Sequence, residues 1–176
     1  MKMPKRYIVF LFFSFTIGLI STSTNDGYSY GYQEHKVGEK IDSLNGVYVY
    51  FNGSVGHVLG RNIVEDGYNL GLKYQCVEFV KRYYYEYFNH KMPDSYGHAK
   101  DFFDDGLGDG QLNIQRGLVQ YCNSGKSKPQ VNDLIVFKAV PGEPFGHVAI
   151  VSAVYDDGIE IIQQNPLPGV GSREVI

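Results

Sequence analysis

The chain has 176 residues, of which 43% are hydrophobic and 20% are charged, an ordinary composition for a single globular domain. Its 16 basic residues are outnumbered by 19 acidic ones, which gives a net charge of -3 and no excess of positive charge for binding a phosphate backbone. Length, composition and charge therefore favour one globular domain and argue against nucleic acid as a partner.

The chain opens with basic residues followed by an apolar run. Three of the first six residues are Lys or Arg, and mainly apolar residues follow from position 7 to position 20, before Ser21, Thr22 and Ser23. A signal peptide has an apolar core of ~7–15 residues, whereas a membrane-spanning helix needs ~20. We therefore predict a signal peptide over residues 1–23 and export to the periplasm or the extracellular space. The alternative is that this segment stays uncleaved as a membrane anchor.

The next segment is polar and rich in glycine. We expect residues 24–42 to lead loosely into the domain, because Gly27, Gly31 and Gly38 interrupt any periodic pattern. Residues 43–176 are then predicted to form a single domain.

The clearest helical pattern of the chain begins at Cys76. Apolar side chains recur every three or four residues as far as Phe88, and Pro93 prevents the helix from continuing. Charged residues occupy the other positions and are expected to face solvent: Glu78, Lys81, Arg82 and Glu86. A thiol in the first turn of a helix feels unpaired backbone N–H groups and the helix dipole, which both favour the thiolate. We therefore predict a reactive Cys76 with a lowered pKa.

The second cysteine, Cys122, has no comparable setting. It precedes a polar stretch that contains Gly125, so we expect it in a loop, as a spare thiol or a minor structural residue. Two cysteines in an exported chain also allow a disulfide bond between Cys76 and Cys122. Such a bond would exclude a nucleophilic role for Cys76, so the two interpretations compete.

Three strand-like runs near the C-terminus, residues 131–140, 147–155 and 159–165, predict an antiparallel meander. With the helix, they predict the α+β class. Alternation places His147 and Ala149 on one face of the middle strand. With a three-residue hairpin loop, Val151 would face Gln163, and Asn165 would lie diagonal to His147. Polar residues would then gather near His147, as in a functional site.

Three ordered motifs are distinctive: YQCVEFV at residues 74–80, GHVAIV at 146–151 and QQN at 163–165. Together they resemble the CHAP family of cysteine- and histidine-dependent amidohydrolases and peptidases, and the glutathionylspermidine amidases within it are most similar. The resemblance runs from about Gly46 to Asn165. It implies a papain-like fold, in which a helix with the nucleophilic cysteine packs on an antiparallel sheet that carries the histidine.

Carried over residue by residue, the resemblance implies that Cys76 is the nucleophile, His147 its base and Asn165 an amide near the histidine. The family commonly has Glu at the position of Gln163, and a neutral amide orients an imidazole but stabilises imidazolium less than a carboxylate does. The hypothesis is that Cys76 attacks an amide carbonyl and forms a thioester, which water hydrolyses. The Cys76 backbone N–H and the Gln75 side chain are candidate oxyanion donors. This chemistry needs no metal or cofactor.

Location and resemblance point to different substrates. Export favours a cell-wall peptide, with cleavage of amide bonds in peptidoglycan, whereas the similarity to glutathionylspermidine amidases favours a small polyamine amide. A catalytically weak or dead wall-binding module is a further alternative, because Gln163 replaces Glu and few residues follow Asn165. A membrane is expected as a partner only through an uncleaved N-terminal segment, and the sequence leaves the oligomeric state open.

An aspartate-rich stretch offers oxygen ligands for Ca²⁺: Asp101, Asp104, Asp105 and Asp109. Its spacing does not match the established twelve-residue calcium loop, so a solvated turn is the preferred interpretation and no metal site is predicted.

Overall fold

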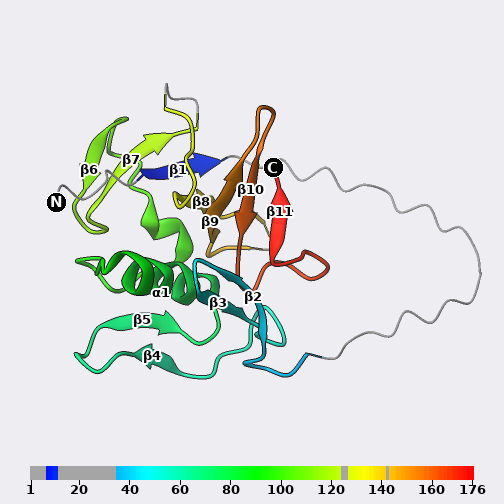
Figure 1. Cartoon of the computed structure of the whole chain (residues 1–176). Helices are drawn as coiled ribbons and strands as arrows, with labels where there is room; N and C mark the ends of the chain where they lie inside the picture. Colours follow the sequence, from blue (N-terminus) through cyan, green and yellow to red (C-terminus); the bar gives the residue numbers. More distant parts are fainter. Residues whose placement is uncertain (1–6, 12–34, 124–126, 142) are drawn as a thin grey trace, which may run out of the picture.

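The computed structural model describes residues 7–11, 35–123, 127–141 and 143–176. Within these ranges the chain forms one long helix, α1 (Cys76–Phe88), a 3-10 helix, η1 (Ala99–Phe102), and eleven strands. Figure 1 shows α1 lying between the large sheet and the short hairpins. This arrangement confirms the predicted α+β class and is consistent with a papain-like fold.

Seven strands form the large sheet in the order β11-β10-β9-β8-β1-β7-β6. Their bounds are β1 (Tyr7–Leu11), β6 (Gln111–Asn113), β7 (Leu118–Cys122), β8 (Leu134–Phe137), β9 (His147–Val154), β10 (Ile159–Ile162) and β11 (Arg173–Val175). Strands β8, β9, β10 and β11 pair antiparallel in succession, so the predicted meander is confirmed and gains a fourth strand.

Strand β1 lies in the interior of this sheet and pairs in parallel on both sides. Tyr7 is opposite Val119 of β7, and Ile8 is opposite Leu134 of β8. These residues belong to the predicted signal peptide, residues 1–23, of which the other parts lie outside the described residues. A protein from which residues 1–23 were removed would lack β1, and the signal peptide stays a prediction.

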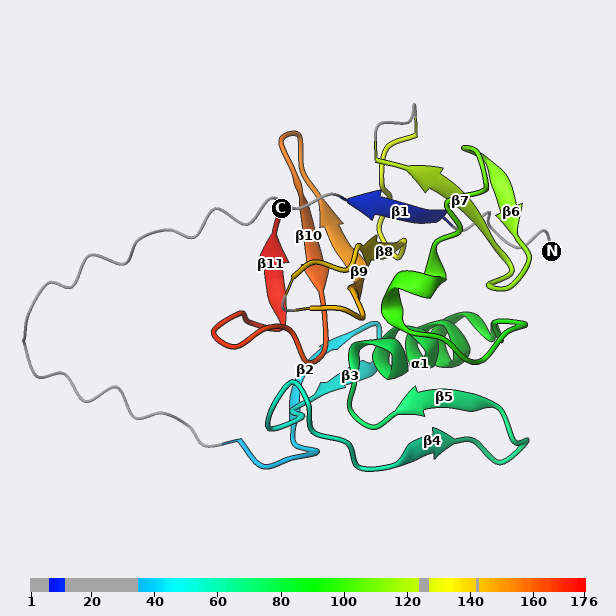
Figure 2. The same cartoon turned by 180° about the vertical axis from the view of Figure 1, so that it is seen from behind.

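Two short hairpins flank the helix. The first consists of β2 (Lys40–Leu44) and β3 (Val47–Tyr50), and the second of β4 (Arg61–Ile63) and β5 (Asn69–Leu72). The predicted lead-in, residues 24–42, is described only from residue 35, and its last residues belong to β2. The rear view in Figure 2 shows β4 and β5 running beside α1 on the side away from the large sheet.

Helix α1 has the predicted bounds. It starts after Gln75, whose backbone is extended, and ends at Asn89, whose left-handed conformation (φ 50°) lets its N–H donate to Tyr84 O. Phe79 and Val80 on its apolar side are fully buried in a cluster with residues of β3, β8 and β9. Burial of this apolar side explains why the helical period was readable in the sequence.

The prediction of a solvated face on α1 is wrong. Glu78, Lys81 and Arg82 are 0%, 1% and 5% exposed, and of the four charged residues only Glu86 is exposed. The cause is the β4–β5 hairpin, which packs on the side of the helix that the large sheet leaves free. The helix is therefore covered on two sides, and its charged residues need partners inside the protein.

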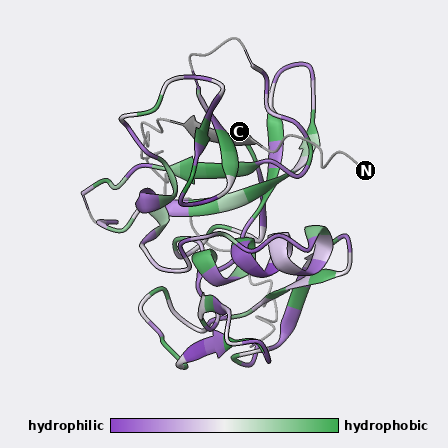
Figure 3. Ribbon diagram, turned by 90° about the vertical axis from the view of Figure 1, so that its left-hand side faces the viewer, coloured by the Kyte–Doolittle hydropathy of each residue, from purple (hydrophilic) through white to green (hydrophobic). Residues whose placement is uncertain are grey.

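Both faces of the meander are apolar. Leu134, Val136, Val148 and Ile150 belong to the cluster around α1, whereas Ile135, Ala149, Val151 and Ile161 form a second cluster. Figure 3 shows hydrophobic residues concentrated on the sheet strands, while α1 carries hydrophilic and hydrophobic residues. By the same alternation, His147 begins the face that carries Ala149 and Val151, as predicted.

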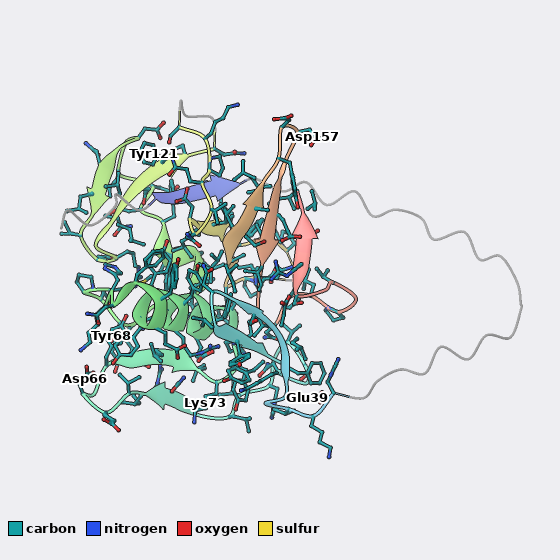
Figure 4. The ribbon with its side chains drawn as sticks, viewed as in Figure 1. Glu39, Asp66, Tyr68, Lys73, Tyr121 and Asp157 are labelled. Carbon is teal, nitrogen blue, oxygen red and sulfur yellow. The ribbon has the colours of Figure 1, made fainter. Side chains whose placement is uncertain are left out.

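Lys81 ends beneath the β4–β5 hairpin. Its Nζ donates to the backbone carbonyls of Asn69 and of Ser95 and lies 4.9 Å from the centre of the Tyr68 ring. Figure 4 shows Tyr68 and Asp66 at the end of this hairpin, near α1. Burial lowers the pKa of Lys81 to about 8.

The register of the β9–β10 hairpin differs from the predicted one. Val151 pairs with Ile161 and not with Gln163. Ile159 pairs with Val154 and not with Tyr155, so the register differs by one residue from the hairpin loop onward, and the irregularity between Glu160 and Ile161 adds a second residue. Strand β10 ends at Ile162, so Gln163 follows directly after the strand. This shift makes Gln163, rather than Asn165, the residue that meets His147.

Candidate active site

Cys76 is the first residue of α1, and a tight turn from β5 places it there. The backbone N–H of Gln75 donates to Leu72 O at 2.9 Å, which closes the turn between strand and helix. Gly71 permits the close approach of the two elements, since a Cβ at this position would lie 3.2 Å from the backbone of Glu78. The helix N-terminus is therefore held against β5 with Cys76 at its tip.

His147 is the first residue of β9, and a glycine sets its approach. Gly146 has φ 69°, and a Cβ there would meet the carbonyl oxygen of Phe137 at 2.5 Å. His147 and Cys76 line the same cavity, of about 420 Å³, together with Asn165 and Glu143. The fold therefore brings the predicted nucleophile and the predicted base into one site.

The amide of Gln163 fixes the tautomer of His147. His147 Nε2 lies 2.9 Å from Gln163 Oε1, while Gln163 Nε2 donates to Gly171 O at 3.2 Å and to Glu174 Oε2 at 3.5 Å. A carbonyl and a carboxylate only accept, so the amide nitrogen must face them and its oxygen must face the histidine. His147 Nε2 therefore donates the hydrogen bond, and Nδ1 is the basic nitrogen of the neutral ring.

Burial governs the thiol. It raises the pKa of Cys76 to about 11, although hydrogen bonds from the backbone of Val148 and Val77 favour the thiolate. The nearby carboxylate of Glu143 raises this pKa further. The predicted lowering of the Cys76 pKa is therefore wrong, because loss of solvent outweighs the position at the helix N-terminus.

Burial acts on the imidazole in the opposite direction. It lowers the pKa of His147 to about 4, and the hydrogen bond to Gln163 offsets only part of this effect. The side chain is 8% exposed and has a neutral amide where a carboxylate would stabilise imidazolium. At neutral pH the resting site therefore holds a neutral thiol and a neutral imidazole.

Gln164 ties the end of β10 to the start of α1. Its Nε2 donates to Gln75 O at 3.0 Å and to Glu78 Oε2 at 2.9 Å, and its Oε1 accepts from the backbone N–H of Tyr50 at 2.8 Å. Glu78 also pairs with Arg82 at 2.6 Å in the protein interior. Gln75 precedes Cys76 and Gln164 follows Gln163, so this buried network fixes the positions of Cys76 and Gln163 relative to each other.

Asn165 lies in the Cys76 cavity but contacts other residues than the histidine. Its Nδ2 donates to Gln75 Oε1 at 2.8 Å and to Val55 O at 3.0 Å. Gln75 Nε2 in turn donates to the carbonyls of His57 at 2.8 Å and Val55 at 3.2 Å, which occupies both of its hydrogens. The Gln75 side chain thus has no hydrogen to give an oxyanion in this arrangement, and the backbone N–H of Cys76 is the candidate donor.

Two buried cations hold residues 95–99, which line the same cavity. Arg116 is 1% exposed and donates to the carbonyls of Asp94, Tyr96 and Asp101 at 2.8 to 3.0 Å. Lys81 donates to Ser95 O in the same segment at 2.7 Å. This role of Arg116 could not be predicted from the sequence, because binding to backbone carbonyls leaves no motif.

The second cysteine is placed differently from the prediction. Cys122 is the last residue of β7, not a loop residue, and its N–H donates to Asp109 Oδ1 at 2.7 Å. Both cysteines are free thiols, so the alternative of a Cys76–Cys122 disulfide bond is wrong.

The aspartate-rich stretch makes turns. Asp104 Oδ1 accepts from the N–H of Gly106, and Asp101 Oδ2 accepts from the N–H of His98. Among the described residues, no three His, Cys, Asp or Glu side chains gather where they could hold a metal ion. The same part of the chain has no helix of the length and apolarity needed to cross a membrane.

An α+β fold that brings a cysteine at a helix N-terminus and a buried strand histidine to one cavity is consistent with a papain-like fold. The family model of the CHAP domain matches residues 64–165, more than half of the chain. The chain belongs to the CHAP domain family, whose members are generally amidohydrolases or peptidases, and the resemblance seen in the sequence is confirmed.

One curated relative is a trypanothione synthetase from Crithidia fasciculata. It is 28% identical to this chain over 106 residues, which cover 60% of this chain and 16% of the relative. The chain therefore corresponds to a small part of that protein.

Proposed function

We propose that the protein is a cysteine amidase or peptidase in which Cys76 is the nucleophile and His147 the general base. The observation that carries this proposal is the tautomer of His147: Gln163 holds its Nε2 hydrogen, so the basic Nδ1 remains for the thiol that shares the cavity. Membership of a family of amidohydrolases and peptidases supports the same reaction class.

The resting pair is neutral, so the proton moves during the attack. His147 Nδ1 takes the thiol proton as the Cys76 sulfur adds to the amide carbonyl, and the backbone N–H of Cys76 stabilises the oxyanion. The imidazolium then protonates the leaving amine as the C–N bond breaks, which leaves a thioester on Cys76. His147 next deprotonates a water molecule that hydrolyses this thioester and restores the free thiol.

The proposed substrate is a cell-wall peptide, with cleavage of amide bonds in peptidoglycan by the exported protein. The predicted signal peptide supports this assignment. Similarity to the trypanothione synthetase instead favours a small amide, and a polyamine amide such as glutathionylspermidine is the second candidate. N-terminal sequencing of the protein recovered outside the cytoplasm tests export, because it shows whether residues 1–23 have been removed.

Purified peptidoglycan and glutathionylspermidine, each incubated with the protein, separate these substrates. Release of new amines from one of them, abolished by Cys76→Ser and by His147→Ala, supports the enzyme and names its substrate class. A Cys122→Ser variant is the matched control and should keep the activity. Unchanged amine release in Cys76→Ser would overturn the mechanism. If Cys76→Ser releases no amine but keeps the full effect of the unsubstituted protein on cells, a wall-binding module would be favoured.

A further inference from the structure

Beside the Cys76 cavity lies a second cavity of about 420 Å³. It is lined mainly by apolar side chains: Phe137, Val140, Pro166, Leu167, Val170 and Ile176. His147 and Glu143 line both cavities. Glu143 and His147 therefore stand where the two cavities adjoin, and a ligand in either cavity can reach the Glu143 carboxylate.

The Glu143 carboxylate has no cationic partner among the residues that the structure describes. Its side chain is only partly exposed, and burial raises its pKa. Its backbone is fixed, since its N–H donates to Val140 O at 2.9 Å and its carbonyl accepts from Gly146 at 3.2 Å. The carboxylate is thus held at the junction of the two cavities without a neutralising charge.

The other charged groups that line the two cavities are engaged elsewhere. Lys138 lies 3.7 Å from Asp105, and Arg61 lies over the ring of Tyr96 at 5.3 Å. Glu174 accepts from the Gln163 amide, and Lys100, next to the junction, donates to Pro144 O at 3.1 Å. His98 lines the Cys76 cavity and packs on the Phe145 ring. Because Lys138 and Arg61 make these other contacts, neither forms an ion pair with Glu143, and the Glu143 carboxylate can bind a cation from outside the protein.

We propose that Glu143 is a specificity-determining residue that binds a primary ammonium group on an aliphatic chain of the substrate, while the amide to be cleaved lies in the Cys76 cavity. This inference rests on the proposed function and adds the charge of the substrate to it. A diamino-acid side chain of a wall peptide and a polyamine both present this chemistry. An unpaired carboxylate beside an apolar cavity favours a ligand that combines a cation with methylene groups.

Glu143 also opposes the ionisation of Cys76, which gives the proposal a distinctive signature. The change Glu143→Gln keeps the size of the side chain and removes the charge. It should weaken binding of an ammonium substrate and, at the same time, make the thiol ionise at lower pH. If Glu143 had only a structural role, its replacement would not weaken ammonium binding and lower the pKa of Cys76 at the same time.

The test measures how well small amines protect Cys76 from iodoacetamide at about pH 9, where aliphatic amines remain protonated. The probes are Nα-acetyl-lysine amide for the peptide source, putrescine for the polyamine source and Nα,Nε-diacetyl-lysine amide as the uncharged control. Either cation should protect the unsubstituted protein, and Glu143→Gln should need roughly ten- to a hundredfold more of it. In the absence of ligand, Glu143→Gln should be labelled faster than the unsubstituted protein.

Glu65→Gln is the matched control, because Glu65 is exposed and lines neither cavity. It removes the same charge from the protein and should leave protection unchanged. Equal protection by the diacetyl compound, or protection that survives Glu143→Gln, would overturn the proposal. Protection without cleavage of any amide would count against the proposed function alone, since labelling does not require turnover.

Discussion

The amide oxygen of Gln163 lies 2.9 Å from Nε2 of His147 and holds the imidazole without giving it a counter-charge. Gly171 O and Glu174 Oε2 accept hydrogen bonds from Gln163 Nε2 and thereby fix the orientation of the Gln163 amide. The histidine is therefore well oriented but weakly basic, with a pKa of about 4. The first prediction concerns this pair.

Replacing Gln163 with Glu should raise the pKa of His147, because a carboxylate beside the ring stabilises imidazolium. The low-pH limit of amide hydrolysis should move upward accordingly, as measured by the pH dependence of kcat/KM. Gln163→Glu alone also places two carboxylates near each other, so the change should be larger and cleaner with Glu174→Gln in the same protein. An unchanged acid limb in both variants would show that Gln163 does not control His147.

Labelling of Cys76 by iodoacetamide should be slow at neutral pH and accelerate towards a pH of about 11, because only the thiolate reacts and burial holds the pKa there. A Cys122→Ala background restricts the measurement to one thiol. Rapid labelling below about pH 8 that is lost in His147→Ala would instead reveal a preformed thiolate–imidazolium pair. That result would replace the neutral resting pair in the mechanism.

The protein should lose stability as the pH falls from about 6.5 to about 4. In this window the unfolded chain binds a proton on His147 that the folded protein does not, so the free energy of unfolding decreases on acidification. The loss from this residue is on the order of 3 kcal/mol. Urea unfolding of the protein and of His147→Gln between these two pH values isolates the contribution of His147. If the free energy of unfolding changed equally with pH in the two proteins, the prediction would be contradicted.

Breaking the buried Glu78–Arg82 pair should destabilise the fold by about 3–5 kcal/mol, because either partner alone leaves an unpaired buried charge. Glu78→Gln and Arg82→Met are the single changes, and the double change should cost less than their sum. Glu86→Gln, at an exposed position of the same helix, is the control and should change stability by less than ~0.5 kcal/mol. Additive losses in the double variant would argue against direct coupling.

The sequence predicted helix α1 and the meander well because each has a regular apolar pattern, along one side of α1 and on both faces of the meander. Cys76 to Phe88 packs its apolar side on the sheet, and alternation along β9 separates two clusters. Such patterns depend only on residues within the element, so they can be read without knowing the neighbours.

The burial of the charged residues on α1 could not be predicted from such a pattern. Glu78 and Arg82 have the spacing of a solvated pair, and they are buried because the β4–β5 hairpin covers them and Gln164 completes their hydrogen bonds. The partner of His147 differs from the prediction for a similar reason, since the hairpin loop and the irregularity at Glu160 each move the register by one residue and neither is marked in the sequence. Both errors concern contacts between elements, which a local period does not encode.

The interior position of β1 has a consequence for the order of assembly. This strand precedes the other described strands in the chain, and its partners β7 and β8 follow it by more than 100 residues. Parallel pairing between such distant segments closes a long loop, which makes it a slow step compared with the hairpins that surround it. In a chain that keeps residues 1–23, we therefore expect the meander and the helix to form early and β1 to join the sheet after them.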